Sequence, residues 1–180
     1  ATEVDMIMQP TLVAARKILF LLIAPQLKTF FRYLLENKLG RQEEMESIIQ
    51  SLREKVGKQV PHIVTIDFTR EKSKAVVKLL DEGKKIFLGD LIKDPRKRDK
   101  PLDLVVFVIK SGEQDIVLPP HNYEIQENDQ ILFCGTGLAH RLFNATINSE
   151  YKLFYVQHGV YQTRSYLARW VVRKMNKIRT

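Results

Sequence analysis

The 180-residue sequence contains a single cysteine, Cys134, and few glycines or prolines. One cysteine excludes an intramolecular disulfide framework and any zinc site built from several cysteines. Eight glycines and seven prolines are too few for a collagen-like or low-complexity chain. The neighbours of Cys134 are apolar, so we expect this residue to act as a small buried hydrophobe. A reducing, cytoplasmic setting is the default expectation for such a chain.

The sequence also lacks the motifs that carry common catalytic chemistry. It has no serine nucleophile elbow, no Walker loop and no dinucleotide-binding glycine fingerprint. The histidines show no i, i+3 or i, i+4 spacing to one another or to Cys134, so only folding can bring metal ligands together. We therefore predict no enzyme activity, no catalytic residues and no metal site. The four histidines are His62, His121, His140 and His158.

Long hydrophobic runs are missing as well. The uninterrupted apolar run of residues 18–24 is far shorter than the roughly 20 residues that a membrane-spanning helix needs. A signal peptide needs a small-residue cleavage site after its apolar run, whereas here Pro25 and a second helical pattern follow. The chain begins ATEV without an initiator Met, so we expect it to be part of something longer.

Positive charge is the strongest feature of the composition, with a formal net charge of +8 and a sequence pI of about 9.6. Such a balance is typical of partners that are nucleic acids, anionic membrane surfaces or nucleotide-like ligands. Residues 93–100 and 164–179 carry much of the charge. The first stretch is either a phosphate-binding loop or a solvated insertion. The second is a basic amphipathic helix that suits a membrane surface or a protein docking site equally well.

Two apolar helical patterns precede residue 40. The first starts after Pro10, and Pro25 either interrupts it or begins the second. With no local sheet to cover, these helices expose more apolar surface than one short chain hides, and such patches mark interfaces. We expect a dimer, or docking to a preceding domain. The predicted interface residues are Leu12, Ile18, Leu19, Leu22, Ile23, Phe30, Phe31 and Leu34.

The remaining sequence alternates strand and helix signals and predicts an α+β fold. A charged amphipathic helix comes first, at residues 41–58, and is either a connector or a short coiled-coil seam. Apolar, β-branched runs then predict strands, and 3.6-residue periodicity predicts helices. The predicted strands are 62–68, 104–109, 116–118, 131–134 and 151–156, with a short strand or turn at 86–88; the predicted helices are 73–82, 137–146 and 164–179.

Loop residues give the only hints of a binding site. His121 and Asn122 follow Pro119 and Pro120 in a loop, and loops carry function more often than strands do. Arg96 and Arg98 lie in the basic stretch that precedes this loop. We take these four side chains, His121, Asn122, Arg96 and Arg98, as candidate ligand contacts. The glycine-rich turn at residues 134–137 is explained by close packing of a strand against a helix or, alternatively, by a phosphate cradle.

Several stretches together resemble the regulator-of-K⁺-conductance (RCK, TrkA-type) domains. The opening ATEV and QPTLVAARKILFLL resemble the end of the family's Rossmann lobe and its first crossover helix. Residues 83–91, then LVVFVIKSGEQDIVLPP, then ENDQILFCGT are similar to the family's C-terminal (TrkA-C) lobe. Asn128 stands where the family usually has Gly, and the basic stretch 93–100 departs from the usual spacing. The family's nucleotide-binding glycine loop is missing, so NAD or ATP binding is not carried over.

The resemblance implies an organisation and a function. Residues 1–40 would be the end of a Rossmann lobe plus dimerising crossover helices, 41–60 a connector helix, 61–148 the TrkA-C lobe, and 149–180 a terminal strand and basic helix. The chain would be a ligand-sensing regulatory module of a potassium channel or transporter, a homodimer or higher ring at the cytoplasmic face of the membrane. Its ligand would be a nucleotide, a cyclic dinucleotide or a divalent cation. The alternative is a basic nucleic-acid-binding protein that uses residues 93–100 and the last helix.

Overall fold

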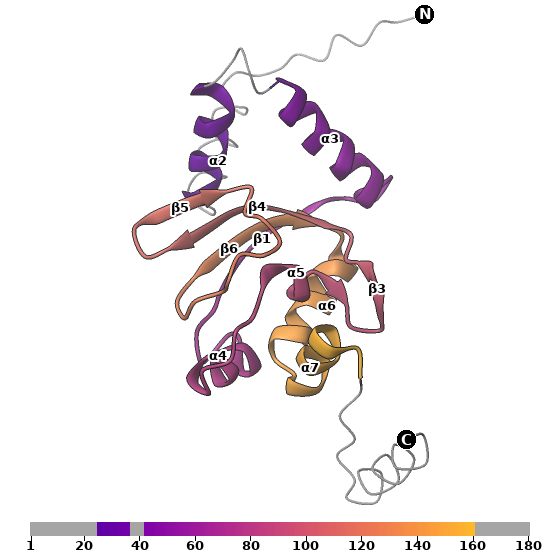
Figure 1. The fold of residues 1–180 in the computed structure, drawn as a ribbon. Coiled ribbons are helices and arrows are strands. Elements are labelled where there is room, and N and C mark those ends of the chain that lie inside the picture. Colours follow the sequence, from indigo (N-terminus) through magenta and orange to yellow (C-terminus); the bar gives the residue numbers. More distant parts are fainter. Residues whose placement is uncertain (1–24, 37–41, 161–180) are drawn as a thin grey trace, which may run out of the picture.

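The computed structural model describes residues 25–36 and 42–160 of the chain. Figure 1 shows a sheet with two helices on one face and the remaining helices on the other. In chain order the elements are α2 (Pro25–Glu36), α3 (Gln42–Val56), β1 (His62–Asp67), α4 (Lys74–Asp81), α5 (Leu88–Leu91), β2 (Lys93–Asp94), β3 (Lys97–Pro101), β4 (Leu104–Ser111), β5 (Gln114–Val117), β6 (Gln130–Gly135), α6 (Gly137–Ile147) and α7 (Glu150–His158).

The main sheet has four strands in the order β1-β6-β4-β5, and every neighbouring pair is antiparallel. A separate two-stranded sheet pairs β2 with β3. Helices that cover the faces of an antiparallel sheet define the α+β class, so the predicted fold class is confirmed. The four strands of the main sheet were all predicted from their apolar, β-branched runs, and α3, α4 and α6 were predicted from helical periodicity.

Strand β6 is buried on both faces. Ile131 and Phe133 belong to the core that α4, α5, α6 and α7 share with the sheet, whereas Leu132 and Cys134 belong to a second core beneath α2 and α3. Successive side chains of a strand point to opposite faces. Four apolar residues in a row therefore need cover on both faces, and the helices of Figure 1 supply it.

Strand β4 contains a β-bulge that faces α2. Val106 pairs with Phe133 and Val108 pairs with Leu132, so Phe107 is the extra residue on this strand. Because a bulge re-aims the side chains beside it, Phe107 and Val108 both lie in the core beneath α2 and α3. The Phe107 ring stacks on Phe30 of α2, with centroids 4.4 Å apart and 12° between the ring planes.

The packing of α2 corrects one premise of the sequence analysis. The second apolar helix does have a local sheet to cover, because Leu27 and Phe30 are buried against the sheet. Ile48 and Leu52 of α3 pack against the same core. The helix begins at Pro25, as one of the two alternatives predicted. The apolar helix predicted before it lies outside the described residues.

Two predicted elements are wrong. Residues 151–156, predicted as a strand, form most of helix α7, in which Leu153 and Val156 are buried three residues apart, as on one helix face. Residues 93–100, predicted as a loop, form a hairpin in which Asp94 pairs with Lys97. The carboxylate of Asp94 accepts a 2.8 Å hydrogen bond from the backbone N–H of Arg96, which is the short-range turn bond typical of aspartate.

Truncating Phe30 tests whether α2 is part of the folded lobe. We expect Phe30→Ala to lower the free energy of unfolding by about 3–5 kcal/mol, because it removes a buried, stacked ring. Phe31→Ala is the matched control, since the Phe31 side chain is 50% exposed; it should cost less than about 1 kcal/mol. Urea unfolding followed by circular dichroism measures both. Equal effects of the two substitutions would mean that α2 contributes little to the lobe.

Candidate functional site

A pocket of about 160 Å³ lies where the end of α3 meets the sheet, α5 and the segment after β5. It is smaller than the roughly 300–1,000 Å³ of sites for drug-sized ligands. Apolar side chains form most of its wall, with one lysine and one histidine among them. The lining residues are Lys55, Leu88, Ile92, Leu104, Val105, Val106, Leu118, Pro119 and His121. This combination of apolar walls with few polar groups is typical of small-ligand sites.

Lys55 is the charged group of this pocket. It lies in the last turn of α3, and its Nζ donates a 2.8 Å hydrogen bond to the backbone oxygen of Leu104. Burial lowers the pKa of Lys55, and the nearby carboxylate of Asp103 opposes this shift. An ammonium group has three donors, so a half-buried lysine with one carbonyl partner suits an anionic ligand oxygen.

The segment that carries His121 is fixed to α5 by backbone hydrogen bonds. The N–H of Gly89 donates to the oxygen of His121 at 2.8 Å, and the N–H of Leu88 donates to the oxygen of Tyr123 at 2.9 Å. A Cβ atom at Gly89 would lie only 2.9 Å from the oxygen of His121. Glycine therefore allows the close approach that positions His121 at the pocket.

The far end of the same segment is fixed by Asp129, which is buried immediately before β6. Its Oδ2 accepts hydrogen bonds from the hydroxyl of Tyr123 at 2.9 Å and from the backbone N–H of Gln126 at 2.8 Å. Asn128 has a φ of 67°, a left-handed conformation that asparagine tolerates better than most residues. Asparagine at this position therefore fits the backbone conformation of the turn before β6.

The structure separates the four candidate ligand contacts. His121 lines the pocket, whereas Asn122 is exposed beside it and is not among the lining residues. Arg96 pairs with Asp94, its Nη2 lying 2.7 Å from Oδ2. The hydrogen bond from the Arg96 side chain is the main cause that lowers the pKa of Asp94. It likewise raises the pKa of Arg96.

Arg98 has a structural partner instead of a ligand. Its Nε donates to the backbone oxygen of Val156 at 2.8 Å, and its Nη2 donates to the oxygen of Gln157 at 3.0 Å. These carbonyls end α7, where backbone acceptors lack helical partners and a cation is favoured by the helix dipole. Gly159 completes this end with a φ of 74°. Arg98 therefore ties the β2–β3 hairpin to α7.

Lys55 was missed by the sequence analysis, although the sequence holds a signal for it. It follows Leu52 by three residues and Ile48 by seven, so it lies on the apolar side of its helix. A lysine there places its charged end at the boundary between α3 and the sheet. The hydrogen-bond acceptor of Lys55 is the backbone oxygen of Leu104, 49 residues away in the chain. No local sequence pattern predicts that these two groups meet.

The predicted dimer interface divides into described and undescribed residues. Phe30 is buried within the chain itself, Phe31 is half exposed and Leu34 is partly buried. The other five predicted residues lie outside the described ranges: Leu12, Ile18, Leu19, Leu22 and Ile23. Phe31 is thus the one of the three described side chains with an open apolar surface.

The glycine-rich turn between β6 and α6 is closely packed. A Cβ atom at Gly135 would lie 2.6 Å from the oxygen of Asp103, and one at Gly137 would lie 3.2 Å from Nε2 of His62. Thr136 caps α6 through a 3.1 Å hydrogen bond from the N–H of Ala139. Close packing therefore explains both glycines. Cys134 is buried as predicted, and burial raises the pKa of its thiol.

Within residues 25–36 and 42–160, no group of three histidine, cysteine or acidic side chains is placed to hold a metal ion. In the same ranges, no helix has both the length and the apolar character needed to cross a bilayer. No protein-family model matches the sequence, and no curated protein matches it either.

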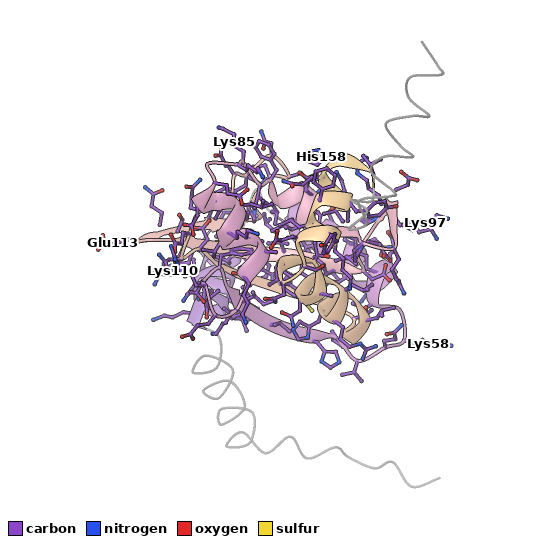
Figure 2. The ribbon with its side chains drawn as sticks, turned by 90° about the horizontal axis from the view of Figure 1, so that it is seen from below. Lys58, Lys85, Lys97, Lys110, Glu113 and His158 are labelled. Atoms are coloured by element: carbon purple, nitrogen blue, oxygen red, sulfur yellow. The ribbon has the colours of Figure 1, made fainter. Side chains whose placement is uncertain are left out.

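The cap on α7 can be tested by removing Arg98. We expect Arg98→Ala to lower the free energy of unfolding by about 1–2 kcal/mol, because two carbonyls lose a charged donor. Lys97→Ala is the matched control, since Figure 2 shows Lys97 pointing away from the body of the protein. Its effect should stay within about 0.5 kcal/mol. Denaturant unfolding measures both, and a loss no larger for Arg98→Ala than for Lys97→Ala would contradict the capping role.

The Asp94–Arg96 pair predicts a dependence on pH. Because the pKa of Asp94 is lowered in the folded state, its stabilising contribution is complete above the unfolded value of about 3.9 and is lost as pH falls through the folded value. Arg96 is largely exposed, so Arg96→Ala should cost no more than about 1 kcal/mol at neutral pH. The difference from the wild type should disappear in strong acid. A difference that stays constant across urea titrations from neutral to acidic pH would contradict this assignment.

Proposed function

We propose that this chain is a ligand-sensing regulatory module of a potassium channel or transporter, acting at the cytoplasmic face of the membrane as part of a homodimer or larger ring. The observation that carries the proposal is the pocket at Lys55, because it joins the connector helix α3 to the lobe. The resemblance to RCK domains supplies the potassium-transport context. The stretches that carry this resemblance also contribute to the pocket, through Leu88 from the first stretch and residues 104–106 and 118–119 from the second.

The chemistry of the pocket favours an anionic ligand. Lys55 offers its remaining donors at one end, and the apolar side chains around it strengthen an ion pair by excluding water. Its volume of about 160 Å³ suits a phosphate group with a small part of the attached molecule. Among the ligands implied by the resemblance, a nucleotide or cyclic dinucleotide therefore fits better than a divalent cation, which the charge of Lys55 would repel.

The position of Lys55 also suggests how binding would be transmitted. The hydrogen bond from Lys55 to Leu104 fixes the end of α3 to β4. A ligand that draws the Lys55 ammonium towards itself would change this attachment. Helix α3 shares its core with α2, so a shift of α3 would reach both helices. Binding would then favour one arrangement of the helices over another, which is regulation by population shift.

Nucleic-acid binding has less support among the described residues. Lys58, Lys85, Lys97 and Lys110 lie at different sides of the molecule in Figure 2 and do not gather on one face. In the basic stretch, Arg96 is paired with Asp94 and Arg98 with α7. A nucleic-acid complex would lose affinity steeply with the logarithm of salt concentration, so filter binding at two salt concentrations tests this alternative directly.

Ligand sensing is tested by a thermal-shift screen of inorganic phosphate, nucleotides, cyclic dinucleotides and divalent cations. A ligand at about 100 times its dissociation constant stabilises the folded state by about 2.7 kcal/mol, which raises the melting temperature by several degrees. We expect such a shift with a phosphate-containing compound. It should be absent in Lys55→Met, which keeps the aliphatic stem and removes the charge.

The matched control for this screen is Lys58→Met. Lys58 follows the same helix but is exposed, and its side chain points away from the body in Figure 2. This variant should respond to the ligand as the wild type does. A shift of equal size in Lys55→Met would remove the pocket from the proposal, and the absence of any shift in the wild type would count against ligand sensing by these residues.

A further inference from the structure

The two edge strands of the main sheet, β5 and β1, differ in how far charge and neighbouring elements block the pairing of a further strand. The β5 edge is short and acidic, and α2 reaches it, since the hydroxyl of Thr29 donates to Oδ2 of Asp115 at 2.8 Å. Among the described residues, the β1 edge is longer and carries less charge for its length: β1 pairs only with β6, is six residues long and has its one carboxylate, Asp67, at its last residue. Edges that stay unpaired are normally blunted by charge, proline or a covering element.

The hydrogen-bonding pattern shows which backbone groups of β1 face outward. The N–H of Phe68 donates to the oxygen of Asp129 at 2.8 Å. In an antiparallel pair, hydrogen-bonded and non-hydrogen-bonded residues alternate. Residues 62, 64 and 66 therefore bond to β6, in register with Gly135, Phe133 and Ile131. The N–H and C=O groups of Ile63 and Thr65 point to the open edge.

Most of this edge carries no lysine, arginine or carboxylate. Residues 62–66 read HIVTI, and the first carboxylate is Asp67, which pairs with Lys72 at the end of the strand. Ile63 is 40% exposed and the preceding Val60 is 77% exposed. An open hollow of about 410 Å³ flanks the strand. Its lining residues are Val64, Thr65, Ile66, Glu71, Lys72, His140, Asn144 and Asn148. The edge is therefore accessible on this side, and the charged pair beside it, Lys72 with Asp67, lies at its last residue.

The strand is also complementary to itself. With Val64 placed on a twofold axis, Ile63 lies opposite Thr65 of a second copy, so the outward-facing groups of both residues form two hydrogen-bonded pairs. Pro61, which has no N–H to donate, then lies opposite Asp67 and ends the ladder in the same place on both strands. No like charges face each other across the inner pairs. A twofold interface needs this kind of self-complementary surface.

We propose that a second copy of this chain adds to the sheet at β1, antiparallel and with Val64 on the twofold axis. Each copy contributes four strands, so the result is one continuous eight-stranded sheet. This contact is separate from any interface formed by α2 and the helix predicted before it. It depends on neither the pocket nor a ligand, so it stands or falls independently of the proposed function.

The first test is Thr65→Pro in the full-length chain, which removes the outward-facing backbone N–H of residue 65. Sedimentation velocity over a range of protein concentrations should show a lower assembled mass for Thr65→Pro than for the wild type. Thr65→Val is the matched control, because it keeps the backbone donor and the side-chain shape; it should assemble as the wild type does. Unchanged assembly of Thr65→Pro, with a native circular dichroism spectrum, would overturn the proposal.

A charge-pair test covers the case in which the proline variant fails to fold, and it also reports the register. Thr65→Glu places two carboxylates on the same face of the joined sheet, so it should weaken assembly at least tenfold. Adding Ile63→Lys to it puts a lysine opposite each glutamate of the other copy and should restore assembly in part. Failure of the second substitution to restore assembly would overturn the proposed register.

Hydrogen exchange identifies what covers the edge. In concentrated wild-type protein, the amides of Ile63 and Thr65 should exchange slowly, and dilution below the assembly concentration should speed their exchange. Fast exchange at every concentration would overturn pairing at β1. Protection that persists in a species of monomer mass, or that appears only when another protein is added, would assign the edge to a different strand and overturn self-pairing.

Discussion

The fold depends on the burial of β6 from both sides. Its apolar residues alternate between two cores, so the sheet cannot be exposed on either face without uncovering them. This constraint requires α2 and α3 above the sheet as much as it requires α4 to α7 below it (Figure 1). The helices that precede β1 are therefore structural parts of the lobe. The pocket lies at the boundary between the two faces, because Lys55 at the end of α3 and Leu88 at the start of α5 both line it.

The site combines contacts of very different sequence range. The attachment of Lys55 to Leu104 spans 49 residues, whereas the cradle of His121 depends on a glycine 32 residues earlier. Neither contact is strong by itself, since a single hydrogen bond contributes about 1 kcal/mol. Together they place one cation and one imidazole at the junction of a helix, a strand and a loop. A junction of this kind moves when any of its elements moves, as the proposed sensing role requires.

The sequence predicts the main sheet and most helices because β-branched runs and helical periodicity are local signals. It fails where tertiary partners decide. Residues 151–156 read YKLFYV and are rich in the aromatic and apolar residues typical of strands, yet Arg98 and Gly159 complete a helix end there. The sequence also does not reveal that Arg98 is occupied by α7, or that Phe107 is an extra residue in its strand. Of the candidate site, only His121 was anticipated, from its place in a loop, whereas Lys55 needed the folded chain.

The bulge at Phe107 adds one residue to β4 without changing the pairing of the strand on either side of it. Val106 packs against the core shared with α4 to α7, whereas Phe107 and Val108 both lie in the core beneath α2 and α3. Loss of Phe107 would turn the bulge into a regular ladder, because Val106 and Val108 would stay opposite Phe133 and Leu132. The following side chains would keep their faces, but α2 would lose the ring that stacks on Phe30. The extra residue is therefore needed for the attachment of α2 and not for the pairing of the strands, so its loss in a related chain should be accompanied by a change at the position of Phe30.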